Sequence, residues 1–264
     1  HIRIIKIVSH NDNCMNKDIF ENELQIAKFT AKKAGEILIE KRNDLQHSIF
    51  SSDTDLKLKA DLESEKFIKE YIQANSDYPI LAEESGKSVE DLGEIFWVVD
   101  PLDGTANYAR NLPLCCVSIA LVENLKPVVG VIFDFNNNDL YQGSTNTKAL
   151  KNDEMINISN INDQKKGILL TGLPNNTDFS DASIFNFVKD FQNWRKVRMI
   201  GSAAMAAAYV ASGSADVYKE NNTYLWDIAA GAAIVESAGG TVKITEPNEN
   251  YQVNVFISNG KIIN

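Results

Sequence analysis

The sequence predicts an α+β protein in which helices and sheets are stacked in layers. Apolar residues recur at helical spacing over the first part of the chain, and short runs rich in Val and Ile then follow one another as strands. Helical segments return among strands in the second half, and such elements bury their apolar faces against one another. The 264 residues, 44% of them apolar, suffice for one large core.

Two amphipathic helices are predicted first. Residues 17–42 place apolar side chains at helical spacing, with Lys and Glu between them. Residues 47–55 read as a loop. Residues 61–75 form the second helix, in which Asp61 stands at the start and the apolar face consists of Phe67, Ile68, Tyr71 and Ile72.

A series of strands follows. In the first half, we expect strands at 79–85, 95–100, 115–123 and 127–134, and a hairpin turn at 134–139 that returns into 140–144. In the second half, strands are predicted at 167–172, 197–200, 215–220, 240–245 and 252–258. Two helices lie among them, at 202–213 and 226–240, and each ends in glycine. The most polar join, at about 150–166, divides the chain into two halves.

Composition excludes several classes of protein. The net charge is −10 and the pI is about 4.9, so the basic surface that nucleic acids or anionic membranes require is missing. No apolar run approaches the roughly 18 residues of a membrane-spanning helix. The three cysteines show no metal-ligand spacing, and we interpret them as small buried hydrophobes of a reducing compartment. We therefore expect a soluble, cytoplasmic protein without nucleic-acid or membrane partners.

Acidic residues stand where predicted strands end or helices begin. Glu83 and Glu84 follow an apolar strand, Asp100 and Asp103 follow another, and Asp61 and Asp227 open helices. Each has an ordinary alternative. Asp61 and Asp227 are also typical helix N-caps, Glu83 and Glu84 a typical solvated pair, and Asp100 before proline a typical start of a turn. The combination favours one shared cleft.

The stretch 97–108, Trp-Val-Val-Asp-Pro-Leu-Asp-Gly-Thr-Ala-Asn-Tyr, predicts a metal site. Two carboxylates three positions apart repel each other unless a cation lies between them, and Mg²⁺ prefers such oxygen ligands. Asp100 and Asp103 would bridge neighbouring ions, with the Leu102 carbonyl as a neutral ligand. The backbone amides of Gly104 and Thr105 are suited to phosphate oxygens.

Other reaction types lack residues. The three histidines, at 1, 10 and 47, stand far from these motifs, so a Ser–His–Asp or Cys–His arrangement has no base. No Walker loop or GxGxxG motif is present.

These motifs resemble those of the inositol monophosphatase family of magnesium-dependent, lithium-sensitive phosphatases. The stretch 97–108 is similar to its Asp-Pro-(Ile/Leu)-Asp-Gly-Thr motif, residues 80–85 to its Gly/Ala-Glu-Glu-Ser motif, and residues 226–240 to its Trp-Asp-x-Ala-Ala-Gly…Gly-Gly motif. The likeness spans about residues 20–258. It implies the family's layered αβαβα sandwich, in which residues 17–264 form a single phosphatase domain with halves of about 17–150 and 151–264. Residues 1–16 are then an N-terminal extension.

The resemblance also implies roles for individual residues. Glu83, Asp100 and the Leu102 carbonyl match the ligands of a first Mg²⁺, and Asp100, Asp103 and Asp227 those of a second; Glu83 would also face a third, weaker ion. Thr105 and Asp61 match the pair that orients the attacking water, so the catalytic residues would be Asp61, Thr105 and Glu83. Residues matching substrate contacts are Asp103, Gly104, Thr105, Ala203 and Glu220. From the residues alone, Glu220 is equally an exposed loop acid.

We therefore expect an Mg²⁺-dependent phosphomonoesterase, with two or three ions per site, that hydrolyses a small polyol or sugar phosphate similar to inositol 1-phosphate. The resemblance also implies a homodimer. The alternatives are a 3′(2′),5′-bisphosphate nucleotidase or a fructose-1,6-bisphosphatase on the same core, and a catalytically silent binding protein. One departure from the family concerns Leu58, which stands where the family often has threonine.

Overall fold

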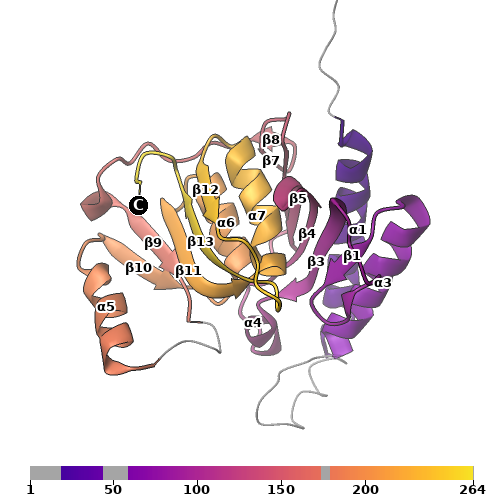
Figure 1. Cartoon of the computed structure of the whole chain (residues 1–264), viewed down its shortest axis with the longest axis horizontal. Coiled ribbons are helices and arrows are strands. Elements are labelled where there is room, and N and C mark those ends of the chain that lie inside the picture. The colour runs from indigo at the N-terminus through magenta and orange to yellow at the C-terminus, as the bar shows by residue number, and fades with distance from the viewer. Residues whose placement is uncertain (1–18, 44–58, 174–178, 264) are drawn as a thin grey trace, which may run out of the picture.

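Two β-sheets alternate with three layers of helices. The structure, a computed structural model, describes residues 19–43, 59–173 and 179–263. Helices α1 (Glu21–Glu40) and α3 (Lys59–Asn75) cover the outer face of the first sheet, whereas α6 (Ala203–Ala211) and α7 (Leu225–Ser237) lie between the sheets (Figure 1). Helix α5 (Asp181–Phe191) lies beyond the second sheet. The predicted layered α and β fold is confirmed.

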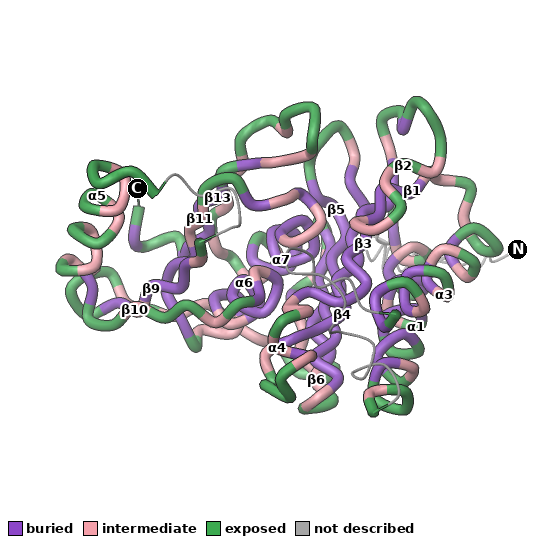
Figure 2. Tube along the Cα trace, turned by 90° about the horizontal axis from the view of Figure 1, so that it is seen from below, coloured by how far each residue is buried: buried purple, intermediate pink, exposed green. Residues whose placement is uncertain are grey.

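The first sheet has eight strands in the order β2-β1-β3-β4-β5-β6-β7-β8. β1 and β3 are parallel and the other pairs antiparallel. Helices cover both faces, so the central strands are buried almost throughout (Figure 2). The strands are β1 (Ile80–Ala82), β2 (Gly86–Lys87), β3 (Ile95–Asp103), β4 (Cys116–Glu123), β5 (Lys126–Asp134), β6 (Asp139–Ser144), β7 (Leu150–Lys151) and β8 (Glu154–Met155).

The second sheet has five strands in the order β10-β9-β11-β13-β12. β9 is parallel to both of its neighbours, and the remaining pairs are antiparallel. The strands are β9 (Ile168–Thr171), β10 (Lys196–Met199), β11 (Val217–Tyr224), β12 (Thr241–Ile244) and β13 (Gln252–Ser258). β11 continues past the predicted end at residue 220, with a register shift between Glu220 and Thr223.

The central helices are composed mainly of small residues because they must fit between two sheets. Most alanines of α6 and α7 are buried in the core between the sheets. Strand β5 also approaches α7 closely at Gly130, because a Cβ added to Gly130 would lie 2.1 Å from the Ala230 carbonyl oxygen. Gly213 and Gly239 follow the two helices with positive φ, as their predicted role at helix ends requires.

Some expectations were wrong or incomplete. The polar join predicted at 150–166 is not wholly a connection, because β7 and β8 lie in it and extend the first sheet. The sequence reading also omitted α5 and the short helix α4 (Thr105–Ala109). Cys115 and Cys116 are buried free thiols, as expected. The predicted extension 1–16, the loop 47–55, Leu58 and the three histidines lie outside the described residues.

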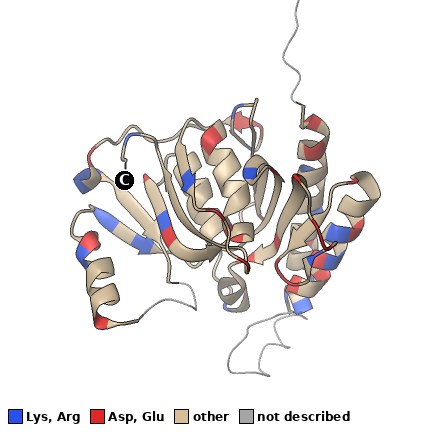
Figure 3. Ribbon diagram, viewed as in Figure 1, with Lys and Arg blue, Asp and Glu red and all other residues tan. Residues whose placement is uncertain are grey.

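Lys and Arg are scattered over several elements of the described chain, α3, α5 and β10 among them (Figure 3). Among the described residues, no helix is both long enough and apolar enough to cross a membrane.

Candidate active site

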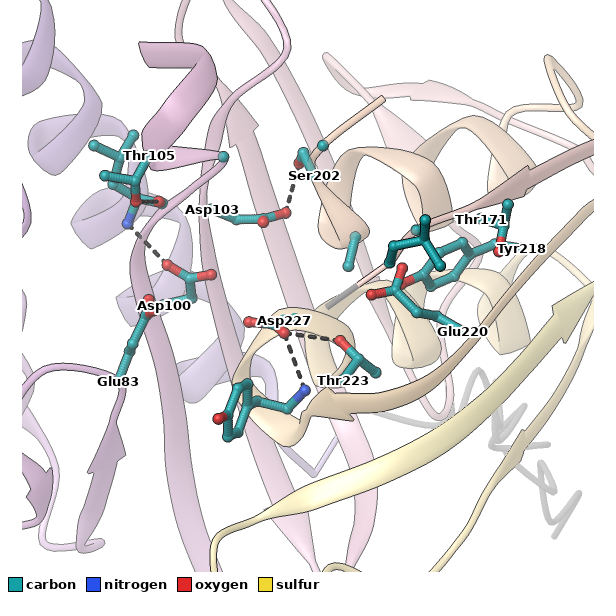
Figure 4. Close-up of a pocket in the computed structure, with 17 residues that line it drawn as sticks. Glu83, Asp100, Asp103, Thr105, Thr171, Ser202, Tyr218, Glu220, Thr223 and Asp227 are labelled. Atoms are coloured by element: carbon teal, nitrogen blue, oxygen red, sulfur yellow. Dashed lines mark hydrogen bonds between the residues drawn. The ribbon is translucent and has the colours of Figure 1, made fainter. Parts of the chain in front are cut away.

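Strand ends and helix starts converge on one pocket between the two sheets. The pocket has a volume of about 480 Å³, and its wall includes the carboxylates of Glu83, Asp100, Asp103, Glu220 and Asp227. Figure 4 shows Glu83 and Asp100 on one side, Asp103 and Asp227 in the middle, and Glu220 on the far side. The structure therefore brings together five predicted acids from four separate segments of the chain.

A local irregularity in β3 delivers two carboxylates to this pocket. The pairing of β3 with β4 shifts register between Asp100 and Asp103, so the strand does not alternate regularly there. Asp100 Oδ1 accepts the backbone N–H of Leu102 at 2.9 Å, which holds the turn around Pro101. Asp100 is thus both the predicted turn former and a buried acid of the pocket, 1% exposed.

Asp103 is bound to the N-terminus of α6. Its Oδ2 accepts the Ser202 hydroxyl at 2.5 Å and the Ala204 N–H at 2.7 Å. Ser202 also accepts the Met205 N–H as the N-cap of the helix. Ala203, predicted to contact substrate, is the first residue of α6 and lines the pocket. The sequence analysis missed Ser202, although a serine directly before an alanine-rich helix is a recognisable cap signal.

Asp227 is the third residue of α7 and not its N-cap, which is Tyr224. Its Oδ2 accepts the Thr223 hydroxyl at 2.8 Å and the Tyr224 N–H at 3.0 Å. The alternative N-cap reading is therefore wrong in position, although the carboxylate does bind the first turn. Thr223 is a second residue that the sequence analysis missed.

Burial and mutual repulsion raise the pKa values of these acids. Desolvation, with the nearby charge of Asp227, raises the pKa of Glu83 to about 8. Desolvation and the charge of Glu83 raise the pKa of Asp100 well above its usual range. Burial raises the pKa of Asp103 to about 7 and that of Asp227 to about 6. The wall of the pocket includes no Lys, Arg or His among the described residues. The site therefore concentrates acidic groups, and the described pocket wall has no basic side chain to neutralise them when they ionise.

Thr105 links two other elements of the site. Its hydroxyl oxygen lies 3.1 Å from Asp61 Oδ1 and 3.1 Å from the Leu102 carbonyl oxygen, and it has one hydrogen to donate to either acceptor. Asp61 is 1% exposed and lies inside α3, two residues after Lys59, so its alternative reading as an N-cap is wrong. Gly104 precedes Thr105 with φ of 89°, and a Cβ there would lie 2.7 Å from the Leu114 carbonyl oxygen.

Glu220 lies within β11, which corrects the alternative of an exposed loop acid. Its Oε2 accepts the Tyr218 hydroxyl at 3.0 Å, and burial raises its pKa to about 7. Gly172, directly after β9, leaves room for it, because a Cβ on Gly172 would lie 2.1 Å from Oε2. Tyr218 and Gly172 were not singled out from the sequence, since only the pairing of β9 with β11 places them here.

The donor set fits a hard cation. All the candidate ligand atoms are carboxylate or carbonyl oxygens, which Mg²⁺ and Ca²⁺ prefer. In the described part of the chain, no three Asp, Glu, His or Cys side chains form a ready-made cage around one ion. Mg²⁺ does not need such a cage, because it usually keeps several waters and binds one or two carboxylates together with substrate phosphate.

Comparison with known proteins identifies the family of this chain. The sequence model of the inositol monophosphatase family matches residues 21–263. The chain belongs to the inositol monophosphatase family. The predicted resemblance is confirmed, and because members of this family include named inositol-1-monophosphatases, the chain is placed among the phosphoric monoester hydrolases.

Individual relatives carry two kinds of name. The chain is 41% identical over 216 residues to the Nus factor SuhB of Xylella fastidiosa, with 80% of this chain and 78% of the relative covered. It is 35% identical over 212 residues to an inositol-1-monophosphatase of Synechocystis sp., covering 79% and 74%. The solved inositol monophosphatase from Anabaena (Nostoc) sp. PCC 7120 shares 33% identity and a TM-score of 0.77, covering 90% of this chain and 91% of that one.

Proposed function

We propose that this protein is an Mg²⁺-dependent phosphomonoesterase that hydrolyses a small polyol or sugar phosphate similar to inositol 1-phosphate. The observation that supports it most directly is a group of four acids on one pocket wall without a described basic residue: the buried Asp100 and Asp103 and the partly buried Glu83 and Asp227. An anionic substrate would be repelled there unless cations reverse the local charge.

The proposed metal ligands are those that the family resemblance implies, and all of them line the pocket. Glu83, Asp100 and the Leu102 carbonyl would hold one ion, and Asp100, Asp103 and Asp227 a second, with Glu83 also facing a third. Asp103 and Asp227 each use Oδ2 for protein hydrogen bonds, which leaves Oδ1 for a ligand role. The bound ions would neutralise the phosphate and lower the pKa of a water molecule.

The protein's own groups would orient the reaction. Thr105 would help to orient the attacking water, and it would accept a proton from that water as its own hydroxyl proton passes to Asp61. The amides of Gly104 and Thr105 would bind phosphate oxygens. Across the pocket, Glu220 and the backbone of Ala203 would bind hydroxyl groups of the alcohol, and Asp103 would lie between the two ends of the substrate.

The experiment is phosphate release from a panel of esters, assayed in EDTA, in Mg²⁺ and in Mg²⁺ with excess Ca²⁺. The panel contains inositol 1-phosphate, other sugar phosphates, fructose 1,6-bisphosphate, histidinol phosphate and a 3′,5′-bisphosphate nucleotide. We expect EDTA to abolish release, Mg²⁺ to restore it, and Ca²⁺ to inhibit because it accepts looser geometry. Full activity in metal-free protein would refute the proposal.

The same panel tests the alternatives. Preferred hydrolysis of the nucleotide or of fructose 1,6-bisphosphate would reassign the substrate within the class, and no release from any ester would favour a silent binding protein. Lithium inhibition, a homodimer, a cytoplasmic location and a single domain over residues 17–264 belong to the proposal as well.

A second candidate role comes from the SuhB relative. Its 41% identity over most of both chains favours a role as a Nus factor, in partnership with transcription factors. Binding of purified transcription factors by the wild-type protein and by Asp100→Asn separates the two roles. Binding that survives loss of phosphatase activity establishes the second role, and absence of binding by the wild type removes it.

A further inference from the structure

One face of α3 carries more than the predicted Asp61. Asp61, Ser64 and Glu65 stand at positions i, i+3 and i+4, which share a face of a helix. All three are buried, with exposed fractions of 1%, 0% and 4%. Two of them are polar residues with no role in the proposed reaction, and a buried polar group needs a hydrogen-bond partner.

Glu65 holds the turn that carries Glu83. Its Oε2 accepts the backbone N–H of Glu84 at 2.8 Å. One helical turn further on, Lys69 donates to the Ser85 hydroxyl at 2.6 Å, and its Nζ lies 4.0 Å from Glu65 Oε1. The N–H of Glu83 itself is bound to the Val99 carbonyl at 3.1 Å. Successive residues of this turn are therefore fixed to α3 and β3.

Ser64 holds the other acidic turn. Its hydroxyl donates to the Pro101 carbonyl at 2.9 Å, between Asp100 and Leu102, and both atoms are buried. Proline has no N–H to offer the strand ladder, so this carbonyl is one of the few backbone groups by which the turn can be tied down. Asp61, one turn earlier on the helix, reaches Thr105.

We propose that Ser64 and Glu65 are positioning residues that fix the metal-binding carboxylates relative to Asp61, by tying the Glu83 and Asp100 turns to the same rigid helix. The inference rests on the proposed function, because it assumes that Glu83 and Asp100 bind Mg²⁺. Its physical basis is that groups which hold a metal ligand in place typically account for roughly 10- to 100-fold in metal affinity. Without Glu65, the partly buried N–H of Glu84 loses this acceptor, and the turn that carries the Glu83 carboxylate loses one of its ties to α3.

The test measures Mg²⁺ binding by calorimetry without substrate, together with the melting temperature of the metal-free protein. Glu65→Ala removes the acceptor of the Glu84 N–H, whereas Glu65→Gln keeps an oxygen acceptor but removes the charge. Ser64→Ala removes the hydroxyl that donates to the Pro101 carbonyl. Glu70→Ala is the matched control, since it makes the same replacement on the same helix at a side chain that is 67% exposed. The kcat at saturating Mg²⁺ is recorded for each variant.

We expect Glu65→Ala to raise the Mg²⁺ dissociation constant about tenfold and Ser64→Ala several-fold, with kcat at saturating Mg²⁺ changed much less. Glu65→Gln and Glu70→Ala should bind like the wild type. Wild-type Mg²⁺ affinity in both Glu65→Ala and Ser64→Ala would overturn the inference. A loss of Mg²⁺ affinity in Glu65→Gln as large as that in Glu65→Ala would also overturn it, because the effect would then come from the charge of Glu65. If Glu65→Ala does not fold, Ser64→Ala decides. A wild-type protein that binds no Mg²⁺ would instead refute the proposed function.

Discussion

Gly172 is the position where a single added methyl group should change substrate preference. A Cβ at this residue would lie 2.1 Å from Glu220 Oε2 and 2.7 Å from its carboxyl carbon, whereas ordinary contacts begin at 3.4 Å. The φ of Gly172 is not in the left-handed region, so Gly172→Ala adds a collision without backbone strain. The Glu220 carboxylate must then withdraw by about 1 Å or more and lose its place beside the Tyr218 hydroxyl.

The size of the effect follows from what Glu220 is proposed to do. If it accepts hydrogen bonds from substrate hydroxyls, a displacement of about 1 Å should reduce kcat/KM for inositol 1-phosphate by roughly 10- to 100-fold. An ester without hydroxyl groups on its alcohol, p-nitrophenyl phosphate, should change by less than about threefold. Steady-state kinetics on both esters at saturating Mg²⁺ measure this ratio.

A double-mutant cycle tests whether the effect passes through Glu220. Glu220→Gln should by itself weaken kcat/KM for polyol phosphates by about 1.5–3 kcal/mol, the size of a hydrogen bond to a charged group. In a Glu220→Ala background, Gly172→Ala should have little further effect, because the side chain that it strikes is gone. Equal losses on both esters, or additive losses in the cycle, would refute this reasoning and indicate damage to the fold or the metal site.

Three further predictions concern the whole site. Asp100→Asn should lower kcat by roughly 10² or more with a much smaller change in stability, and near-normal turnover at saturating Mg²⁺ would exclude Asp100 as a ligand. In metal-free protein, Glu83, Asp103 and Asp227 have pKa values of about 8, 7 and 6, above the roughly 4 of unfolded chains, so the folded state binds more protons. The melting temperature of the metal-free protein should therefore fall as pH rises from about 5 to 8, and bound Mg²⁺ should remove most of that fall. A melting temperature of the metal-free protein that stays constant or rises over this pH range would contradict the prediction. Light scattering at micromolar concentration should show a dimer. A measured mass of 29.3 kDa, that of the monomer, would contradict this prediction.

Helices and strands with a regular spacing of apolar residues could be predicted, because that spacing is visible within a few neighbouring positions of the sequence. The helical spacing near residues 17–42 and the Val- and Ile-rich run of β4 each depend on neighbours a few positions away. Helix α5 carries the same local signal, which the sequence analysis overlooked. Ile184, Phe187, Val188 and Phe191 stand at i, i+3, i+4 and i+7, the spacing of an amphipathic helix, although none of its residues is buried.

The predicted site residues were found from short motifs. All of them except Asp61 line one pocket, and Asp61 lies beside the pocket residue Thr105. Asp100, Leu102, Asp103, Gly104 and Thr105 are consecutive or nearly so, so any fold that ends a strand there keeps them together. Their proximity to Glu83 and Asp227 was inferred from the positions of these acids at strand ends and helix starts, together with the family resemblance, and no local pattern establishes it.

By itself, the sequence determined which residue types were available: oxygen ligands without a nearby histidine, and glycine where the chain turns at Gly104. Only the tertiary structure decided which groups hold those ligands in place. Ser202 meets Asp103 across 99 positions, Gly172 makes room for Glu220 across two paired strands, and Ser64 and Glu65 reach two turns from a third element. Each of these contacts depends on how whole elements pack, and a hydrogen bond between residues so far apart leaves no periodic trace in the chain.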